Sequence, residues 1–361
     1  MINVTRSIMP DYDKYIKKIE KLWENRWLSN NGKYLVELEN SLEKRFETNC
    51  AVVSNGTLAL LIALELFDFP EKAEIITTPF TFVATSGSII WQKYKPIFVD
   101  IDPMTFNIDT SKIEEKITDK TKAILAVHVF GNPCDIEKID EIAKKYELKI
   151  IYDAAHCFDV YYKKKSIYKL GEISIASFHA TKVFHTIEGG ALFSDNKELI
   201  NRAKRLRNFG FNEKIEIVDK GINAKMNEFQ AAMGLLNLEI VDEEIEKRKK
   251  RFELYKEKLK GLIKFQKLSN YITKYNYIYM PVLFENQDMR DLVYLQLKKE
   301  GYNTRKYFFP SLDEVYNSEN QCRVSHNISK RILHLPLYGD LENENIERVC
   351  SIIENVAGVN K

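Results

Sequence analysis

The sequence lacks the features that mark membrane, secreted and nucleic-acid-binding proteins. No stretch approaches the roughly 18–20 apolar residues of a membrane span, and the first residues, MINVTRSIMPDYDKYIKK, lack the apolar core of a signal peptide. The 54 basic and 52 acidic side chains leave a formal net charge of +2, so no excess of basic groups favours nucleic acid or anionic lipid. We therefore expect a cytoplasmic protein with neither a nucleic-acid nor a membrane partner.

Cysteine is scarce and scattered. The five cysteines are odd in number and form no CxxC pair, which argues against a disulfide framework and against a structural zinc site. Reduced, buried thiols are the expected state. The P-loop, the GxGxxG fingerprint and the HExxH motif are also absent, so the commonest rival cofactor and metal motifs are missing. We predict no metal site.

Short apolar runs alternate with helical patterns between residues 50 and 195. The runs are mostly apolar rather than alternating, which suits strands covered by helices on both faces. Strand–helix alternation over this length predicts an α/β protein with a mostly parallel, seven-stranded sheet. The predicted strands are Ala51–Val53, Ile75–Thr77, Ile97–Val99, Ala123–Val127, Ile150–Tyr152, Ile173–Ser177 and Ala191–Phe193. The predicted helices of this half are Tyr12–Trp23, Lys33–Phe46, Thr57–Phe67, Phe82–Trp91 and Ile136–Tyr146.

The pattern changes after about Leu236. Residues 241–260 are rich in charge with apolar residues at helical spacing, which predicts a long, half-exposed helix. Beyond it, YNYIYMPVLF and SKRILHLPLYG look like strand or loop segments around a helix at Met289–Glu300. Because 361 residues exceed one small core, we predict a large α/β domain over residues 1–240 and a smaller α+β domain over residues 241–361.

Ligands of parallel α/β sheets gather beyond the carboxyl ends of the strands, and several predicted strand ends carry suitable groups. Gly56 and Thr57 open a helix and offer N–H groups and a hydroxyl to a phosphate, although an ordinary helix cap has the same pattern. Asp153 directly follows the predicted strand Ile150–Tyr152, three residues before His156. Such an acid is catalytic, metal-binding or simply a buried cap.

Lys182 follows another predicted strand end. A lysine is a surface residue by default, but in an apolar turn its pKa falls and it can form a Schiff base. Phe80 and Phe82 lie where a strand turns into a helix; aromatics there are usually core, unless a planar cofactor stacks on one. A lysine, an acid, phosphate donors and an aromatic are the groups that pyridoxal phosphate (PLP) requires.

The ordered set of these segments resembles the DegT/DnrJ/EryC/StrS family of PLP-dependent nucleotide-sugar aminotransferases. The resemblance covers essentially the full length and implies the fold type I architecture of that family. It rests on SNGTLAL at 54–60, TTPFTFVAT at 77–85, PIFVDID at 96–102, YDAAH at 152–156, SFHATKVFHTIEGG at 177–190, GINAKMNEFQAA at 221–232 and LHLPLYG at 333–339.

The resemblance implies a role for each matched residue. Lys182 would form the Schiff base with PLP, and Asp153 would pair with the pyridinium nitrogen. His156 stands where relatives often have glutamine and would meet the phenolic oxygen of the cofactor. The remaining contacts would be Gly56, Thr57 and Ser177 at the phosphate, Phe82 on the ring, and Asn223 at the phosphate of the neighbouring subunit. A homodimer with shared active sites is therefore expected.

The turn at Lys182 has alanine and valine where the commoner version has proline and asparagine. It resembles the subgroup that aminates C4 of a dTDP-4-keto-6-deoxy-hexose. The tyrosine-proline-glycine-lysine turn of the 3-aminotransferases is absent, and the dehydratases of this fold carry histidine in place of the lysine. The implied reaction takes the amino group from L-glutamate, releases 2-oxoglutarate and forms dTDP-4-amino-4,6-dideoxyglucose, for the biosynthesis of deoxyamino sugars and surface glycans such as O-antigen lipopolysaccharide. The alternatives are amination at C3, a UDP- or GDP-linked substrate, and a PLP-binding regulator without turnover.

Two further segments are expected to contact the nucleotide and the diphosphate. They are Trp27, Ser29 and Asn30 in the loop WLSNNG, and Arg305, Tyr307 and Phe308 near the C-terminus. A basic side chain with backbone donors suits a diphosphate. An ordinary surface position is the alternative for Arg305.

Overall fold

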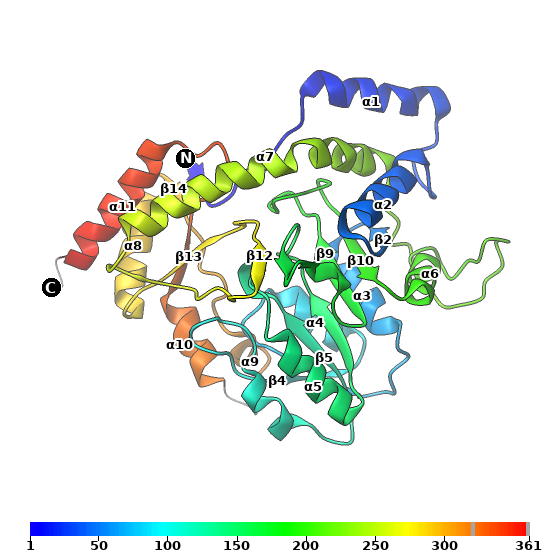
Figure 1. The fold of residues 1–361 in the computed structure, drawn as a ribbon, viewed down its shortest axis with the longest axis horizontal. Helices are drawn as coiled ribbons and strands as arrows, with labels where there is room; N and C mark the ends of the chain where they lie inside the picture. Colours follow the sequence, from blue (N-terminus) through cyan, green and yellow to red (C-terminus); the bar gives the residue numbers. More distant parts are fainter. Residues whose placement is uncertain (319–321, 359–361) are drawn as a thin grey trace.

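A seven-stranded sheet forms the centre of the computed structural model, which describes residues 1–318 and 322–358 (Figure 1). Its strand order is β2-β10-β9-β6-β5-β3-β4, and every pairing is parallel except those of β10, which runs antiparallel to β2 and β9. The strands are β2 (Asn49–Val53), β3 (Glu74–Thr77), β4 (Lys95–Phe98), β5 (Thr121–Val127), β6 (Lys149–Asp153), β9 (Ile173–Ser177) and β10 (Gly190–Ser194). The predicted α/β class and the mostly parallel sheet are confirmed, with a strand at each predicted run.

Both faces of the sheet are buried. Successive side chains of a strand point to opposite faces, and on β2 Ala51 and Val53 enter one hydrophobic cluster while Cys50 and Val52 enter another. The first cluster contains residues of α3 (Gly56–Glu65), α4 (Val83–Trp91) and α6 (Lys197–Leu206); the second contains residues of α2 (Lys33–Phe46), α5 (Ile136–Tyr146) and α7 (Glu228–Lys258). Burial on both faces explains why the strands read as continuous apolar runs.

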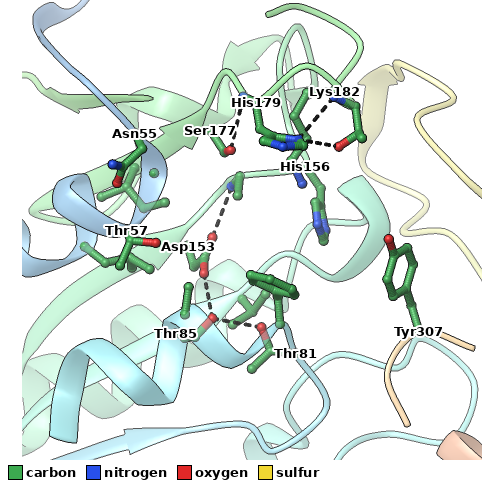
Figure 2. A pocket seen from close by; sticks show the side chains of 18 of the residues that line it. Asn55, Thr57, Thr81, Thr85, Asp153, His156, Ser177, His179, Lys182 and Tyr307 are labelled. Atoms are coloured by element: carbon green, nitrogen blue, oxygen red, sulfur yellow. Dashed lines mark hydrogen bonds between the residues drawn. The ribbon is translucent and has the colours of Figure 1, made fainter. Parts of the chain in front are cut away.

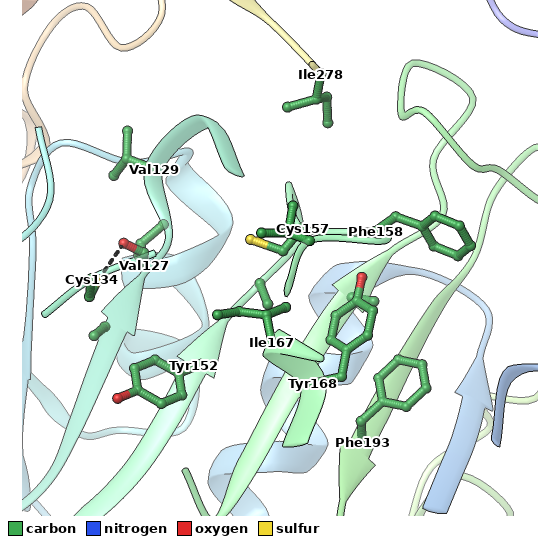
Figure 3. Close-up of a cluster of buried hydrophobic side chains, with 14 of the residues drawn as sticks. Val127, Val129, Cys134, Tyr152, Cys157, Phe158, Ile167, Tyr168, Phe193 and Ile278 are labelled. Carbon is green, nitrogen blue, oxygen red and sulfur yellow. Dashed lines mark hydrogen bonds between the residues drawn. The ribbon is translucent and has the colours of Figure 1, made fainter. Parts of the chain in front are cut away.

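Aromatic rings fill the second cluster next to β6, β9 and β10 (Figure 3). Tyr168 and Phe193 stack with their ring centroids 4.3 Å apart. Phe46, the last residue of α2, packs edge-on against these rings at 4.9 and 5.6 Å. Such ring pairs contribute about 0.5–1.5 kcal/mol each beyond the burial of their area. They therefore hold α2 firmly against the sheet.

The loop WLSNNG joins α1 (Tyr12–Asn25) to α2 and lies against the start of α7. The carboxylate of Glu228, the first residue of α7, accepts hydrogen bonds from the N–H groups of Tyr34 and Leu35 at 2.7 and 3.0 Å. It thereby caps α2, whose own N-cap residue, Gly32, has no side chain to do so. A Cβ on Gly32 would lie 2.4 Å from the Glu228 carboxyl carbon, so a larger residue there would displace the carboxylate that caps α2.

The C-terminal part has its own small antiparallel sheet and hydrophobic cluster. The strand β13 (Met280–Leu283) lies between β11 (Lys264–Phe265) and β15 (Ile332–Leu335), and α8 (Gln287–Lys299) and α11 (Asn343–Gly358) pack on it. The second half of α7 belongs to the same cluster. This helix begins at Glu228, earlier than the charged segment predicted, because its first half is apolar and buried. It runs unbroken through residue 240, and the division into two domains stays a prediction.

The remaining elements are short. They are β1 (Ile2–Asn3), β7 (Tyr161–Tyr162), β8 (Lys165–Ser166), β12 (Ile272–Lys274), β14 (Tyr302–Asn303), α9 (Leu312–Val315), α10 (Arg323–Arg331) and four 3-10 turns at 110–112, 114–116, 129–131 and 167–169. None of the helices within residues 1–318 and 322–358 is both long enough and apolar enough to cross a bilayer.

A buried ion pair ties α7 to the C-terminal sheet. Arg248 is fully buried and donates its Nε–H to Glu244 Oε1 at 2.6 Å. The same oxygen accepts the N–H of Gly339 at 2.9 Å. The guanidinium also lies 3.4 Å from the carbonyl oxygens of Ile278 and Leu337. Glu244 is buried as well. If one partner of this pair were lost, water could not solvate the charge of the other.

We predict that Arg248→Ala lowers the free energy of unfolding by about 3–5 kcal/mol, because Glu244 would keep its charge without its partner. Urea unfolding followed by circular dichroism measures the change. Lys247→Ala is the matched control: Lys247 pairs with Glu243 at 2.9 Å, but both side chains are exposed, so its loss costs at most about 0.5 kcal/mol. Equal unfolding midpoints for the two variants would contradict the structural role of the buried pair.

Candidate active site

A cavity of about 250 Å³ lies at the carboxyl ends of the parallel strands. Its lining comes from segments that follow β2, β3, β6 and β9, and from Tyr279, Tyr307 and Phe308 of the C-terminal part. Figure 2 shows Lys182 and Ser177 on one side and Tyr307 on another. The cavity therefore occupies the edge of the sheet at which α/β proteins bind their ligands.

Lys182 stands in the turn between β9 and β10. Its N–H donates to the carbonyl oxygen of His179 at 2.9 Å, and the N–H of Phe178 donates to Gly189 at 2.8 Å, so backbone bonds close the turn. Burial lowers the pKa of Lys182 to about 8, against the opposing effect of the negative charge of Asp153. The amine is therefore partly neutral near neutral pH, the state in which a lysine acts as a nucleophile or a base.

Asp153 ends β6 and is held by a chain of hydroxyls (Figure 2). Thr85 Oγ1 donates to Asp153 Oδ2 at 2.8 Å, and the N–H of Ala155 donates to Oδ1 at 3.1 Å. Thr81 and Thr85 share a further hydrogen bond of 2.9 Å; since the single Thr85 hydroxyl proton points at Asp153, Thr81 is the donor. Burial raises the pKa of Asp153, while these donors and the charge of Lys182 act to lower it.

His156 presents one defined nitrogen to the cavity. Its Nδ1 accepts the N–H of Phe130 at 3.2 Å, and we infer that the neutral ring carries its proton on Nε2. Burial, together with the positive charge of Lys182, lowers the pKa of His156 well below its ordinary value. The ring lies parallel to Phe308, with an interplanar angle of 6° and centroids 6.3 Å apart. His156 is therefore a neutral donor.

The start of α3 forms the polar corner of the cavity. Asn55 caps the helix through Leu58, which leaves the first-turn N–H groups of Gly56 and Thr57 without intrahelical partners. A Cβ on Gly56 would lie 3.0 Å from Ser177 Cβ, so the absent side chain lets this backbone approach the Ser177 hydroxyl. Free N–H groups at a helix start, with two hydroxyls, suit a phosphate.

The structure brings together most, but not all, of the predicted site residues. The cavity is lined by Gly56, Thr57, Phe82, Asp153, His156, Ser177, Lys182, Tyr307 and Phe308. It is not lined, within the described residues of one chain, by Trp27, Ser29, Asn30, Asn223 or Arg305. All of these except Ser29, which is partly buried, are exposed. Their contacts with cofactor or substrate stay predictions, as do the roles of the residues in the cavity.

Sequence reasoning did not identify Thr85 and Tyr279 as parts of the site. Thr85 belongs to the segment TTPFTFVAT, where the available signal was a pair of threonines four residues apart, Thr81 just before α4 and Thr85 in its first turn. Tyr279 lies in YNYIYMPVLF, 97 residues after Lys182, and its hydroxyl is 3.4 Å from Lys182 Nζ. No local pattern connects two residues so far apart in the sequence.

Comparison with known proteins agrees with this geometry. The DegT/DnrJ/EryC1/StrS aminotransferase family matches residues 11–354. The chain is 38% identical to a dTDP-4-amino-4,6-dideoxy-D-glucose transaminase from Shigella dysenteriae, over 98% of this chain and 99% of the relative. The crystal structure of DesI in the presence of its TDP-sugar product has a TM-score of 0.91 at 29% identity, over 99% of this chain and 93% of that chain. NtdA from Bacillus subtilis, with bound cofactor PMP, has a TM-score of 0.85 at 27% identity, over 96% of this chain and 82% of that chain.

These matches confirm the fold type I architecture and the predicted resemblance, which extends over almost the whole chain. They also confirm the predicted class of enzyme and its cofactor. The chain belongs to the DegT/DnrJ/EryC1/StrS aminotransferase family and is a PLP-dependent nucleotide-sugar aminotransferase.

Proposed function

We propose that the protein transfers the amino group of L-glutamate to C4 of a dTDP-linked 4-keto-6-deoxy-hexose, forming dTDP-4-amino-4,6-dideoxyglucose. The observation that carries the proposed chemistry is the meeting of Lys182, Asp153 and His156 in one cavity. The choice of substrate is supported by the 38% identical transaminase, whose name specifies this amino sugar. A nucleotide-linked amino sugar is an activated glycan precursor, and we propose that the product is used in the cytoplasm for surface-glycan synthesis.

The residues of the cavity fit PLP from one end to the other. At the polar corner, Gly56, Thr57 and Ser177 supply free N–H groups and hydroxyls for the phosphate. At the other groups of the ring, the Nε2–H of His156 would donate to the phenolic oxygen and Asp153 would accept from the ring nitrogen. Phe82 lines the same cavity and supplies an aromatic face for stacking. This match of donors, acceptor and aromatic face supports the proposed roles.

When bound, PLP supplies an electron sink for the charge left on the carbon that loses a proton. Lys182 is the residue that removes this proton from Cα of the amino donor, since its lowered pKa leaves part of the amine neutral. The Asp153 carboxylate, fixed by Thr85 and the Ala155 N–H, holds a proton on the ring nitrogen because a close negative charge favours the protonated form. In the second half of the reaction, Lys182 acts in the opposite direction and delivers a proton to C4 of the sugar as this carbon receives nitrogen.

We also propose that the functional unit is a homodimer in which Asn223 reaches the phosphate of the neighbouring subunit. Asn223 is exposed, and Ile222 beside it is 42% exposed. Phe82 at the cavity and Trp27 in the loop WLSNNG are 57% and 58% exposed. Exposed large apolar side chains beside polar residues are typical of a protein interface. A second subunit would bury these side chains. Its Asn223 and its WLSNNG loop would then reach the cavity of the first subunit, which the same residues of the first subunit do not line.

We predict that the purified protein, given PLP, L-glutamate and dTDP-4-keto-6-deoxyglucose, forms a 4-amino sugar and an equal amount of 2-oxoglutarate. Lys182→Ala should lower turnover by at least about 10²-fold, because the proton-moving group is lost. NMR of the product locates the new nitrogen. An amine at C3, or turnover only with a UDP- or GDP-linked sugar, would contradict the substrate assignment; wild-type turnover by Lys182→Ala would contradict the mechanism.

We predict that Asp153→Asn still binds PLP but loses about 10²–10³-fold in kcat, because a neutral amide no longer stabilises the charged ring nitrogen. Absorbance of the bound cofactor measures binding, and 2-oxoglutarate release measures turnover. Asp195→Asn is the control, since this exposed carboxylate follows β10 at the opposite edge of the sheet; it should keep wild-type kcat. Full activity in Asp153→Asn would refute the proposed pairing with the ring nitrogen.

We predict that two variants, each weakened alone, restore activity in a hybrid dimer. Asn223→Asp places a negative charge beside the proposed phosphate position and should lower activity at least about tenfold. A hybrid with Lys182→Ala, purified through two different tags, has one site with both native residues and should show about half of wild-type activity. A hybrid with only about half the activity of the Asn223→Asp enzyme would mean that Asn223 and Lys182 of one chain serve the same site, and a fully active Asn223→Asp would exclude the phosphate contact.

A further inference from the structure

The amine of Lys182 has one hydrogen-bond partner within the described residues, the hydroxyl of Tyr279. Lys182 Nζ donates to Tyr279 Oη at 3.4 Å, and the amine lies 5.8 Å from the centre of the tyrosine ring. The two residues come from different segments that line the cavity: the turn between β9 and β10, and the segment that leads into β13. The backbone of the turn is fixed by its own hydrogen bonds, whereas the four-carbon lysine side chain is flexible.

Tyr279 is held more rigidly than the lysine it contacts. Its side chain is buried. Its ring meets His156 and His334 edge-on, with centroids 5.1 and 5.2 Å away, and Phe130 at 5.8 Å. Burial raises the pKa of the Tyr279 hydroxyl, so it remains a neutral phenol throughout the working range of pH. Because these three neighbouring rings hold the tyrosine ring in place, its neutral oxygen is an immobile acceptor that can restrict the orientation of the flexible lysine amine.

We propose that Tyr279 is a positioning residue of the transamination, whose hydroxyl oxygen accepts an N–H of Lys182 and aims the amine at the carbon that exchanges its proton. This inference rests on the proposed role of Lys182. By occupying one N–H, the phenol oxygen leaves the nitrogen lone pair free to face the cavity. A base must lie within hydrogen-bond reach of its proton, and a freely rotating amine would meet that condition only part of the time.

The proton balance leaves Tyr279 unchanged. When Lys182 takes the proton from Cα of the amino donor, its neutral amine becomes an ammonium, and the electron pair stays on the carbon side. Tyr279 Oη then accepts a hydrogen bond from a charged donor, which is a stronger interaction than the one with the neutral amine. The ammonium returns its proton in the next step, and the phenol keeps its own. Tyr279 therefore also favours the charged form of Lys182 and raises its pKa.

Other groups act on the same amine. Asp153, Tyr307 and Cys157 each favour its charged form, and burial opposes them. His156, His179 and Glu188 line the same cavity. None of these six groups is altered by Tyr279→Phe, which removes one oxygen atom and keeps the ring in place. The variant therefore isolates the hydrogen bond.

The test uses the enzyme loaded with pyridoxamine phosphate, in which Lys182 is not bonded to the cofactor. Trace acetylation with acetic anhydride across a pH series, read by mass spectrometry of the peptide containing Lys182, gives the pKa of its amine. Tyr279→Phe should lower this pKa by about half a unit to one unit, because the charged form loses an acceptor. With PLP bound, exchange of the glutamate Cα hydrogen with D2O should slow about tenfold and kcat should fall equally, with KM for glutamate within about twofold.

Tyr277→Phe is the matched control. Tyr277 lies two residues away on the same segment, and its ring packs against Phe252 and Tyr275 instead of lining the cavity. It should leave the labelling pKa and the exchange rate at wild-type values. A Tyr279→Phe enzyme with wild-type labelling pKa and exchange rate would overturn this inference alone. Wild-type turnover in Lys182→Ala would instead overturn the proposed function on which it rests.

Discussion

The removal of water from two opposite charges at one edge of the sheet is the constraint on which the rest of the site depends. Burial lowers the pKa of Lys182 to about 8 and raises that of Asp153, while each charge partly offsets the cost of burying the other. A lysine in water would stay protonated, and a carboxylate without donors would tend to take up a proton. In the cavity, part of the Lys182 amine is neutral and Asp153 can stay ionised, and transamination requires both of these protonation states.

The surrounding structure is arranged to maintain that balance. Thr85, in the first turn of α4, donates a hydrogen bond to Asp153, and Thr81, just before that helix, donates to Thr85. On the other side, the Phe130 N–H fixes which nitrogen of His156 accepts. These partners are backbone groups or short side chains in segments that directly follow strands of a sheet buried on both faces, so they have little freedom to move. Placing the donors in advance avoids paying for their reorganisation during the reaction.

Much of the fold was predictable because its signals are local. Seven apolar runs between residues 50 and 195 became seven strands, and the helices Lys33–Phe46 and Ile136–Tyr146 have the bounds that their patterns predict. The start of α7 was less predictable, since a buried, apolar helix has no charged face to mark its period. The contact of Glu228 with the start of α2 links residues about 190 positions apart, and no periodicity carries that information.

The sequence by itself determined the α/β class, the family and the residues Lys182, Asp153 and His156 as candidates, because strand ends and motifs can be recognised from neighbouring letters. The tertiary structure decided which groups meet. It brought Thr85 within hydrogen-bond distance of Asp153, and Tyr279 within hydrogen-bond distance of Lys182. It left Asn223, Arg305 and most of the loop WLSNNG exposed in the single chain. Strand order and the packing of the C-terminal part set these distances. They arise from contacts between distant segments, whose energies depend on the whole fold rather than on any local pattern.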